Sequence, residues 1–247
     1  MSMITQEQSE FLKKEGYLLV DVLSLMPDEF YEAEQVLNEY IDNKSFDTLV
    51  CNPYQWELEL DDVLKMFPNV ERKKMDEFTG PQDSLVEYHN WIVENYGDNP
   101  QFNQQIWLYK QHKDLFNAFK KNIAKDVYDV KDDELHYIGN TIAEFTLYIP
   151  GSRTPLHQDG CQSGRMCVIL TYLSKDWKED DGGLFKFTDI HGNIQEIKPE
   201  YGKSLILDFT DKFNNERNNL FHEVTLVENN FWRYTHLDSV NSWTFGN

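Results

Sequence analysis

Three side chains of the kind that bind a divalent metal lie in the second half of the sequence. His157 and Asp159 are two residues apart, and in an extended chain this spacing places both side chains on the same side. His222 follows much further along the chain, after several expected strands that can return the chain to the first pair. Two histidines and one carboxylate on one face of a metal leave the other coordination positions free, which is the ligand pattern of non-haem iron(II) sites. We therefore predict that His157, Asp159 and His222 hold iron(II).

The remaining histidines provide a comparison for this prediction, because an isolated His-x-Asp tripeptide is a weak signal. His89 and His112 fall in segments with helical spacing, and His136 and His191 lie near expected strand ends or turns. None of these four has a carboxylate at ligand spacing followed by a returning strand. We therefore interpret them as structural or solvated residues.

The end of the chain predicts an arginine that binds an anion. If residues 229–230 form a two-residue hairpin turn, the strands on either side pair with each other. Arg233 and Thr235 then share the inward face with His222, whereas His236 points away from it. An inward arginine is costly unless an anion meets it. The distal carboxylate of 2-oxoglutarate is a suitable anion, because its other end chelates iron and a guanidinium can hold a carboxylate through two parallel hydrogen bonds. Thr235 can add a hydroxyl donor; the alternative for Arg233 is a surface arginine paired with one of the many acids.

The elements that must position these residues are mainly strands from about residue 134 onward. Short runs of β-branched and aromatic residues alternate there with Gly, Asp and Asn turns, which is typical of strands. Seven or more short strands without helices between them indicate a double-sheet jelly roll. The expected strands are 141–149, 166–173, 184–188, 193–198, 203–209, 219–227 and 231–238.

The first half of the sequence is expected to be mainly helical. Helical spacing of apolar residues runs through 24–41, with a proline early in the segment, and again through 106–127. We therefore predict one α+β domain spanning residues 1–247. Residues 1–133 would be mainly helical and would pack on a jelly-roll core, a double-stranded β-helix, formed by residues 134–247.

Composition excludes several classes of partner. The chain has 43 acidic and 23 basic residues and a formal charge of −20, which would repel a nucleic-acid backbone. Its three cysteines form no Cys-x-x-Cys pair, so neither a disulfide framework nor a zinc-thiolate site is indicated. The N-terminus has no apolar core of signal-peptide length, and no stretch approaches the length of a membrane span. We expect a cytoplasmic protein that binds neither nucleic acid nor membrane.

Four motifs between about residue 141 and 237 can be compared with known families: Tyr148-x-x-Gly151 ahead of His157-x-Asp159, Gly164-Arg165 before the strand that ends at Tyr172, Gly182-Gly183-Leu-Phe, and His222-Glu-Val ahead of Arg233. On these motifs the region resembles the prolyl-4-hydroxylase-like branch of the 2-oxoglutarate/iron(II) oxygenases, with some similarity to the ribosomal-protein prolyl hydroxylases. The N-terminal segment 11–17 is similar to the opening of phytanoyl-CoA-dioxygenase-type chains, a far less specific pattern.

This resemblance implies the same three iron ligands and a salt bridge from Arg233 to the cosubstrate. It also implies cosubstrate or pocket contacts from Tyr148 and Tyr172, for which the alternative is a core aromatic with a satisfied hydroxyl. Two features depart from the family pattern. Arg233 follows the distal histidine at a slightly longer spacing than usual, and Thr154 stands where relatives often carry an aromatic, so no specific substrate is implied.

Residues and resemblance together predict a 2-oxoglutarate-dependent dioxygenase that hydroxylates an unactivated C–H bond. The cofactors would be iron(II), 2-oxoglutarate and dioxygen, with ascorbate as an optional addition. The expected substrate is a prolyl or other amino-acid or peptide group. One alternative is the same oxidant acting on a small-molecule metabolite, and another is a non-catalytic metal-binding jelly-roll sensor. The sequence leaves the oligomeric state open.

Overall fold

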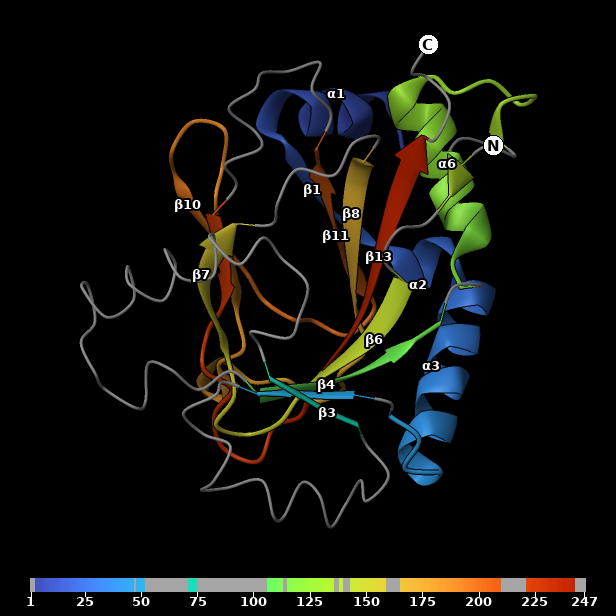
Figure 1. Ribbon diagram of the computed structural model, residues 1–247. Helices are drawn as coiled ribbons and strands as arrows, with labels where there is room; N and C mark the ends of the chain where they lie inside the picture. The colour runs from blue at the N-terminus through green and yellow to red at the C-terminus, as the bar shows by residue number, and fades with distance from the viewer. Residues whose placement is uncertain are drawn as a thin grey trace.

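Two β-sheets face each other, and helices cover the outer face of the larger sheet (Figure 1). Side chains that point between the sheets form one apolar cluster, and those between the larger sheet and the helices form a second. The computed structural model describes residues 3–46, 48–51, 71–74, 106–112, 115–135, 138–139, 143–158, 165–209 and 221–242.

The larger sheet of the described residues has the strand order β1-β11-β8-β13-β6-β4-β2-β3, and β5 pairs with β13. Neighbouring strands are antiparallel except β2 and β3, which are parallel. The strands are β1 (Tyr17–Asp21), β2 (Thr48–Cys51), β3 (Glu71–Lys74), β4 (Ile106–Gln111), β5 (Ile138–Gly139), β6 (Ala143–Tyr148), β8 (Arg165–Tyr172), β11 (Lys203–Asp208) and β13 (Arg233–Ser242).

The smaller sheet faces the inner side of the larger one and has the order β10-β9-β12-β7, all antiparallel. A short 3-10 turn, Glu179–Asp181, precedes β9. The strands are β7 (Thr154–Gln158), β9 (Phe185–Thr188), β10 (Ile194–Ile197) and β12 (Phe221–Val224). The seven strands expected after residue 140 are confirmed, while β7 is an additional strand that sequence patterns did not indicate.

Four described helices pack along the larger sheet: α1 (Gln6–Glu15), α2 (Val22–Leu25), α3 (Pro27–Asp42) and α6 (Asn117–Tyr128). The first begins with a capping box between Thr5 and Gln8 and ends at Gly16, whose φ of 82° favours glycine. The expected helix over 24–41 corresponds to α2 and α3, with Pro27 at the start of α3. Within the described residues, no helix has the length and apolar character needed to cross a bilayer.

The single helix expected over 106–127 is wrong in its first six residues. Residues Ile106–Gln111 form β4, which pairs with β2 and β6. The helix begins only at Asn117, after Phe116 in a left-handed conformation with φ of 52°. Its first N–H groups donate to the Glu29 carboxylate of α3, at 2.8 Å from Ala118 and 3.2 Å from Phe119. A residue distant in sequence therefore caps this helix, and no local pattern could reveal that.

The hairpin expected around residues 229–230 is also wrong. The strands before and after it, β12 and β13, lie in different sheets. The backbone between them bonds to other segments: Gly151 N–H donates to Val227 at 2.8 Å, and Gly183 N–H donates to Leu226 at 2.9 Å. The chain thus crosses from the smaller sheet to the larger one instead of folding back.

The alternation along β13 nevertheless places its odd-numbered residues as expected. Arg233, Thr235 and Leu237 face the smaller sheet, whereas His236 and Asp238 face the helices, because successive strand residues point to opposite sides. Asp238 and Lys120 of α6 form a buried ion pair at 2.9 Å. Burial raises the pKa of Asp238 to about 6, against the lowering effect of Lys120.

His236 should make the protein less stable in acid. Its ring lies between Phe116 and Phe145, at centroid distances of 5.3 and 5.0 Å. Burial, and then the charge of Lys120, lower its pKa to about 3. Below the ordinary histidine pKa of about 6.5 the unfolded chain binds a proton that the folded chain does not, so folding stability is lost as pH falls from about 6.5 towards 3.

Replacing His236 with phenylalanine is therefore expected to remove this loss. Relative to the variant, the wild type should lose about 1.4 kcal/mol of unfolding free energy per pH unit below about 6.5. Urea denaturation of both proteins at pH 7.5, 6.5 and 5.5 measures the difference, and Asp238 is present in both. If the unfolding free energies of the two proteins differ by the same amount at all three pH values, the acid sensitivity does not come from His236.

Candidate active site

Two of the three expected iron ligands come from neighbouring strands of the smaller sheet. His157 in β7 and His222 in β12 are direct cross-strand partners, and such partners lie on the same face of a sheet. The His222 ring is buried and lies 5.4 Å from the Phe185 ring between centroids. Asp159 lies outside the described residues, as does the side chain of His157. No three His, Cys, Asp or Glu side chains form a metal-binding group among the residues that the structure describes, so the triad itself stays a prediction.

Arg233 is the largest fully buried side chain among the described residues. Its Nε donates to the Gly183 carbonyl at 2.9 Å, and one terminal nitrogen donates to the Thr235 hydroxyl at 2.8 Å. The other terminal nitrogen is buried and has no hydrogen-bond partner in the structure. No carboxylate of the described residues forms an ion pair with this guanidinium. The site therefore contains a buried cation with unused donors.

The two expected tyrosines flank this guanidinium. Tyr148 of β6 is the cross-strand partner of Arg233, and Tyr172 of β8 is the partner of Thr235. The guanidinium carbon lies 5.2 Å from the Tyr148 ring centroid and 5.4 Å from that of Tyr172. Strand register thus brings together all four residues that the sequence suggested for the cosubstrate.

The two tyrosine hydroxyls differ in their contacts. That of Tyr148 shares a hydrogen bond of 2.7 Å with Thr154, which connects β6 of the larger sheet to β7 of the smaller one. That of Tyr172 is buried without a hydrogen-bond partner. Burial raises the pKa of Tyr172 to about 12, against the lowering effect of the nearby Arg233. The Tyr172 hydroxyl therefore stays protonated at neutral pH and can donate to an anion.

The charge state of Arg233 also fits an anionic ligand. Burial lowers its pKa from the usual 12.5, whereas the nearby tyrosines oppose that effect. A guanidinium keeps its proton in proteins, so this buried charge lacks compensation until an anion arrives. The unpartnered nitrogen of Arg233 and the unpartnered hydroxyl of Tyr172 together suit one carboxylate.

Two contacts of this site were not expected from the sequence. Thr154 appeared only as a departure from the family pattern, yet it bonds to Tyr148. Gly183 appeared only within the Gly182-Gly183-Leu-Phe motif, yet its carbonyl holds Arg233. The Gly182-Gly183 pair could be recognised in the sequence. That Arg233 donates to the Gly183 carbonyl could not, because the two residues meet only where the chain crosses from the smaller sheet to the larger one.

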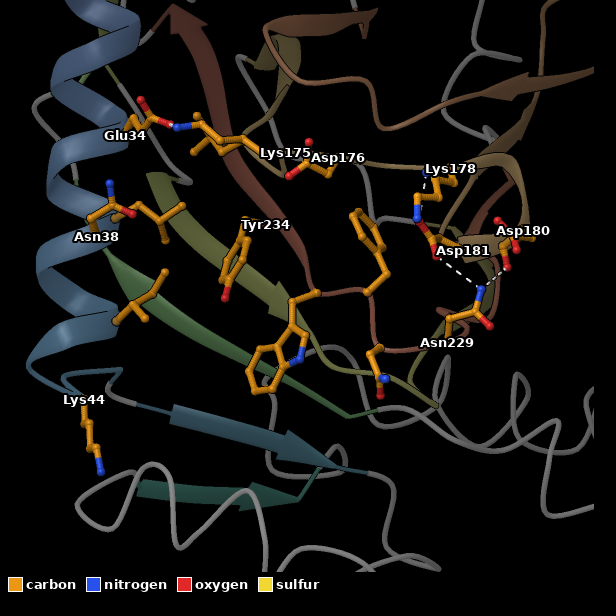
Figure 2. A pocket seen from close by; sticks show the side chains of 16 residues that line it. Glu34, Asn38, Lys44, Lys175, Asp176, Lys178, Asp180, Asp181, Asn229 and Tyr234 are labelled. Atoms are coloured by element: carbon orange, nitrogen blue, oxygen red, sulfur yellow. Dashed lines mark hydrogen bonds and ion pairs between the residues drawn. The ribbon is translucent and has the colours of Figure 1, made fainter.

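A cavity of about 910 Å³ lies elsewhere, between α3 and the loops that flank β9 and β13 (Figure 2). Aromatic side chains, Trp232 and Tyr234 among them, line it together with charged residues of both signs. Neither His222 nor Arg233 lines this cavity. The cavity is therefore distinct from the candidate iron and cosubstrate site.

Residues 143–243 match the family model described as the 2OG-Fe(II) oxygenase superfamily. The matched region contains β6, β7, β8, β12 and β13, and every residue proposed above for the site falls within its bounds. The match confirms the resemblance seen in the sequence and supports a 2-oxoglutarate-dependent dioxygenase. The family implies iron(II), 2-oxoglutarate and dioxygen.

Solved structures share the fold at low sequence identity. A prolyl-4-hydroxylase from Pseudomonas putida has a TM-score of 0.56 and 13% identity, covering 95% of this chain and 97% of that one. A prolyl hydroxylase from Trichoplax adhaerens, in complex with a hypoxia-inducible-factor peptide, has a TM-score of 0.56 and 15% identity, covering 96% and 89%. The carbocyclase SnoK of nogalamycin biosynthesis has a TM-score of 0.55 and 9% identity, covering 98% and 86%. No curated protein sequence matches the chain.

Proposed function

We propose that this dioxygenase hydroxylates an unactivated C–H bond and that His157, Asp159 and His222 bind its iron. The single observation that carries the proposal is the buried Arg233, which has a terminal nitrogen without a hydrogen-bond partner and whose guanidinium carbon lies 5.4 Å from the ring centroid of Tyr172. A binding module has no need of such a paired anion site. The two facing sheets are further assigned to a double-stranded β-helix, in which His157 and His222 lie on the smaller sheet and the anion site on the larger.

The protein groups have separate tasks in this proposal. When bound, iron(II), 2-oxoglutarate and dioxygen supply an oxidant that adds one oxygen atom to a C–H bond, while succinate takes the other and carbon dioxide is released. Arg233 and Tyr172 hold the distal carboxylate of 2-oxoglutarate, and Thr235 fixes one terminal nitrogen of Arg233. Burial excludes water from these contacts, which strengthens each of them.

The substrate is proposed to be a prolyl or other amino-acid group, free or within a peptide. The fold likeness to prolyl hydroxylases supports this choice, and one of them was solved with a peptide. A small-molecule metabolite is the second candidate, favoured by a fold likeness with a TM-score of 0.55 to a carbocyclase of nogalamycin biosynthesis. The proposal includes ascorbate as an optional addition to the cofactors. It also places the protein in the cytoplasm.

Cosubstrate binding should stabilise the fold only when metal is present. Manganese(II), used in place of iron to prevent turnover, together with 2-oxoglutarate is expected to raise the melting temperature more than either alone. The reason is that each ligand bound only by the folded state shifts the equilibrium, and the metal forms half of the cosubstrate site. Thermal denaturation with each ligand and with both gives the comparison.

Glutarate serves as the control acid, because it keeps both carboxylates but lacks the keto oxygen that chelates metal. If manganese(II) with glutarate raises the melting temperature as much as manganese(II) with 2-oxoglutarate, the proposed site is wrong. Iron-loaded protein should also release succinate from 2-oxoglutarate. A mass-spectrometric search for products heavier by one oxygen atom, among peptides and free amino acids, then identifies the substrate class.

A further inference from the structure

The side chain of Arg233 is held by the backbone of the turn that precedes β9. Its Nε donates to the Gly183 carbonyl at 2.9 Å, and both groups are away from solvent. Gly183 has φ of +67°, and a Cβ at this position would lie 3.1 Å from Cδ of Arg233 and 3.3 Å from a methyl carbon of Val227. A side chain at residue 183 would therefore press on the stem of the arginine.

The turn itself is fixed to the segment that leads into β13. Gly183 N–H donates to Leu226 at 2.9 Å, and Glu228 N–H donates to Asp181 at 2.7 Å. The indole N–H of Trp177 donates to the carbonyl of the preceding glycine at 2.9 Å. Figure 2 shows the far side of this turn, where the Asn229 side chain bonds to Asp181 at 3.2 Å. The Gly183 carbonyl is therefore a rigid acceptor rather than a mobile loop group.

We propose that Gly183 is a positioning residue for the cosubstrate: its carbonyl sets the rotation of the Arg233 guanidinium, and its lack of a side chain leaves room for the arginine stem. With Nε and one terminal nitrogen engaged, the donor without a partner is the other terminal nitrogen of a guanidinium that lies between the Tyr148 and Tyr172 rings. The direction of this nitrogen decides whether a carboxylate can accept from both Arg233 and Tyr172. The inference rests on the proposed function, because it takes Arg233 to be the cosubstrate anchor.

Three glycine-to-alanine variants separate positioning from strain and from general destabilisation. Gly183→Ala tests the proposal. Gly192→Ala has a similar φ of +81° but no atom within 4 Å of the added carbon, so it measures backbone strain alone. Gly202→Ala has φ of +84° and its Cβ would lie 2.8 Å from Leu23, so it adds a steric conflict away from Arg233.

The first readout is the dissociation constant of 2-oxoglutarate, measured by calorimetry on manganese-loaded protein. Gly183→Ala is expected to raise it about tenfold, because a small misplacement of a binding group weakens a directional contact. Both control variants should stay within about twofold of the wild type, even if they melt earlier. In an Arg233→Ala background, which has neither the side-chain stem nor Nε–H, Gly183→Ala should add less than about twofold.

The second readout needs neither metal nor cosubstrate. The Arg233 Nε–H resonance, identified by its loss in Arg233→Lys, should exchange slowly with water in the wild type and faster in Gly183→Ala. If Gly183→Ala leaves the dissociation constant of the wild type unchanged, or changes it equally in the Arg233→Ala background, the inference about Gly183 is overturned while the proposed function stands. A protected Nε–H in a wild type that binds no 2-oxoglutarate would overturn the proposed function, and with it the role of Gly183.

Discussion

Replacing His222 with alanine is expected to abolish succinate release and to weaken metal binding. His222 is the cross-strand partner of His157, so its loss would remove one of three proposed iron ligands. Changes in residues that only support a metal ligand cost about 10- to 100-fold in affinity or activity, and loss of a ligand should cost at least about 100-fold. Turnover assays with added iron and a metal titration measure the two effects.

His191→Ala is the matched control for this variant. His191 is an exposed histidine whose ring lies 3.1 Å from the Glu15 carboxylate, and its loss should leave turnover unchanged. Strand pairing of β12 depends on the backbone, so His222→Ala should keep its cooperative unfolding. Turnover that survives in His222→Ala would show that another residue binds the iron. His236 is a poor substitute, because it lies on the helix side of the larger sheet.

Replacing Arg233 with alanine is expected to raise the 2-oxoglutarate KM about 10- to 100-fold. A hydrogen bond to a charged group contributes about 1.5–3 kcal/mol, and each 1.4 kcal/mol is about tenfold in affinity. Arg233→Lys should be intermediate, because it keeps the charge and loses the planar pair of donors. Succinate release at varied 2-oxoglutarate concentration gives the KM of each variant.

Arg165→Ala provides the control for a buried arginine elsewhere. Arg165 begins β8, whereas Tyr172 ends it, so the two are about 23 Å apart along the strand at roughly 3.3 Å per residue. This variant should leave the KM for 2-oxoglutarate unchanged. If instead Arg165→Ala raises the KM and Arg233→Ala does not, the anchor is Arg165 and the proposed site is misplaced.

Local patterns in the sequence were sufficient for seven of the strands after residue 140 and for the side of β13 on which Arg233 lies. Alternation has a period of two along any strand, so Arg233 and Thr235 must share a face and His236 must take the other. The predicted orientation of Arg233 and Thr235 is therefore correct, although the hairpin at residues 229–230 from which it was argued does not form. The metal ligands were suggested in the same way, by residue type and spacing, and the structure adds that positions 157 and 222 are direct partners.

Tertiary structure decided what lies opposite each of these residues. The segment 225–232 bonds to Gly151, Ser152 and the Gly182–Gly183 turn rather than to β13. The local sequence of neither segment predicts which backbone groups pair across the two sheets. Similarly, residues 106–111 have helical spacing but pair as β4 because two strands offer them hydrogen bonds, and α6 begins where Glu29 supplies acceptors. Local propensities are worth less than about 1 kcal/mol per residue for most residues, so such long-range partners override them. The contact between the Gly183 carbonyl and Arg233 also depends on tertiary structure, because the two residues meet only where the chain crosses from the smaller sheet to the larger one.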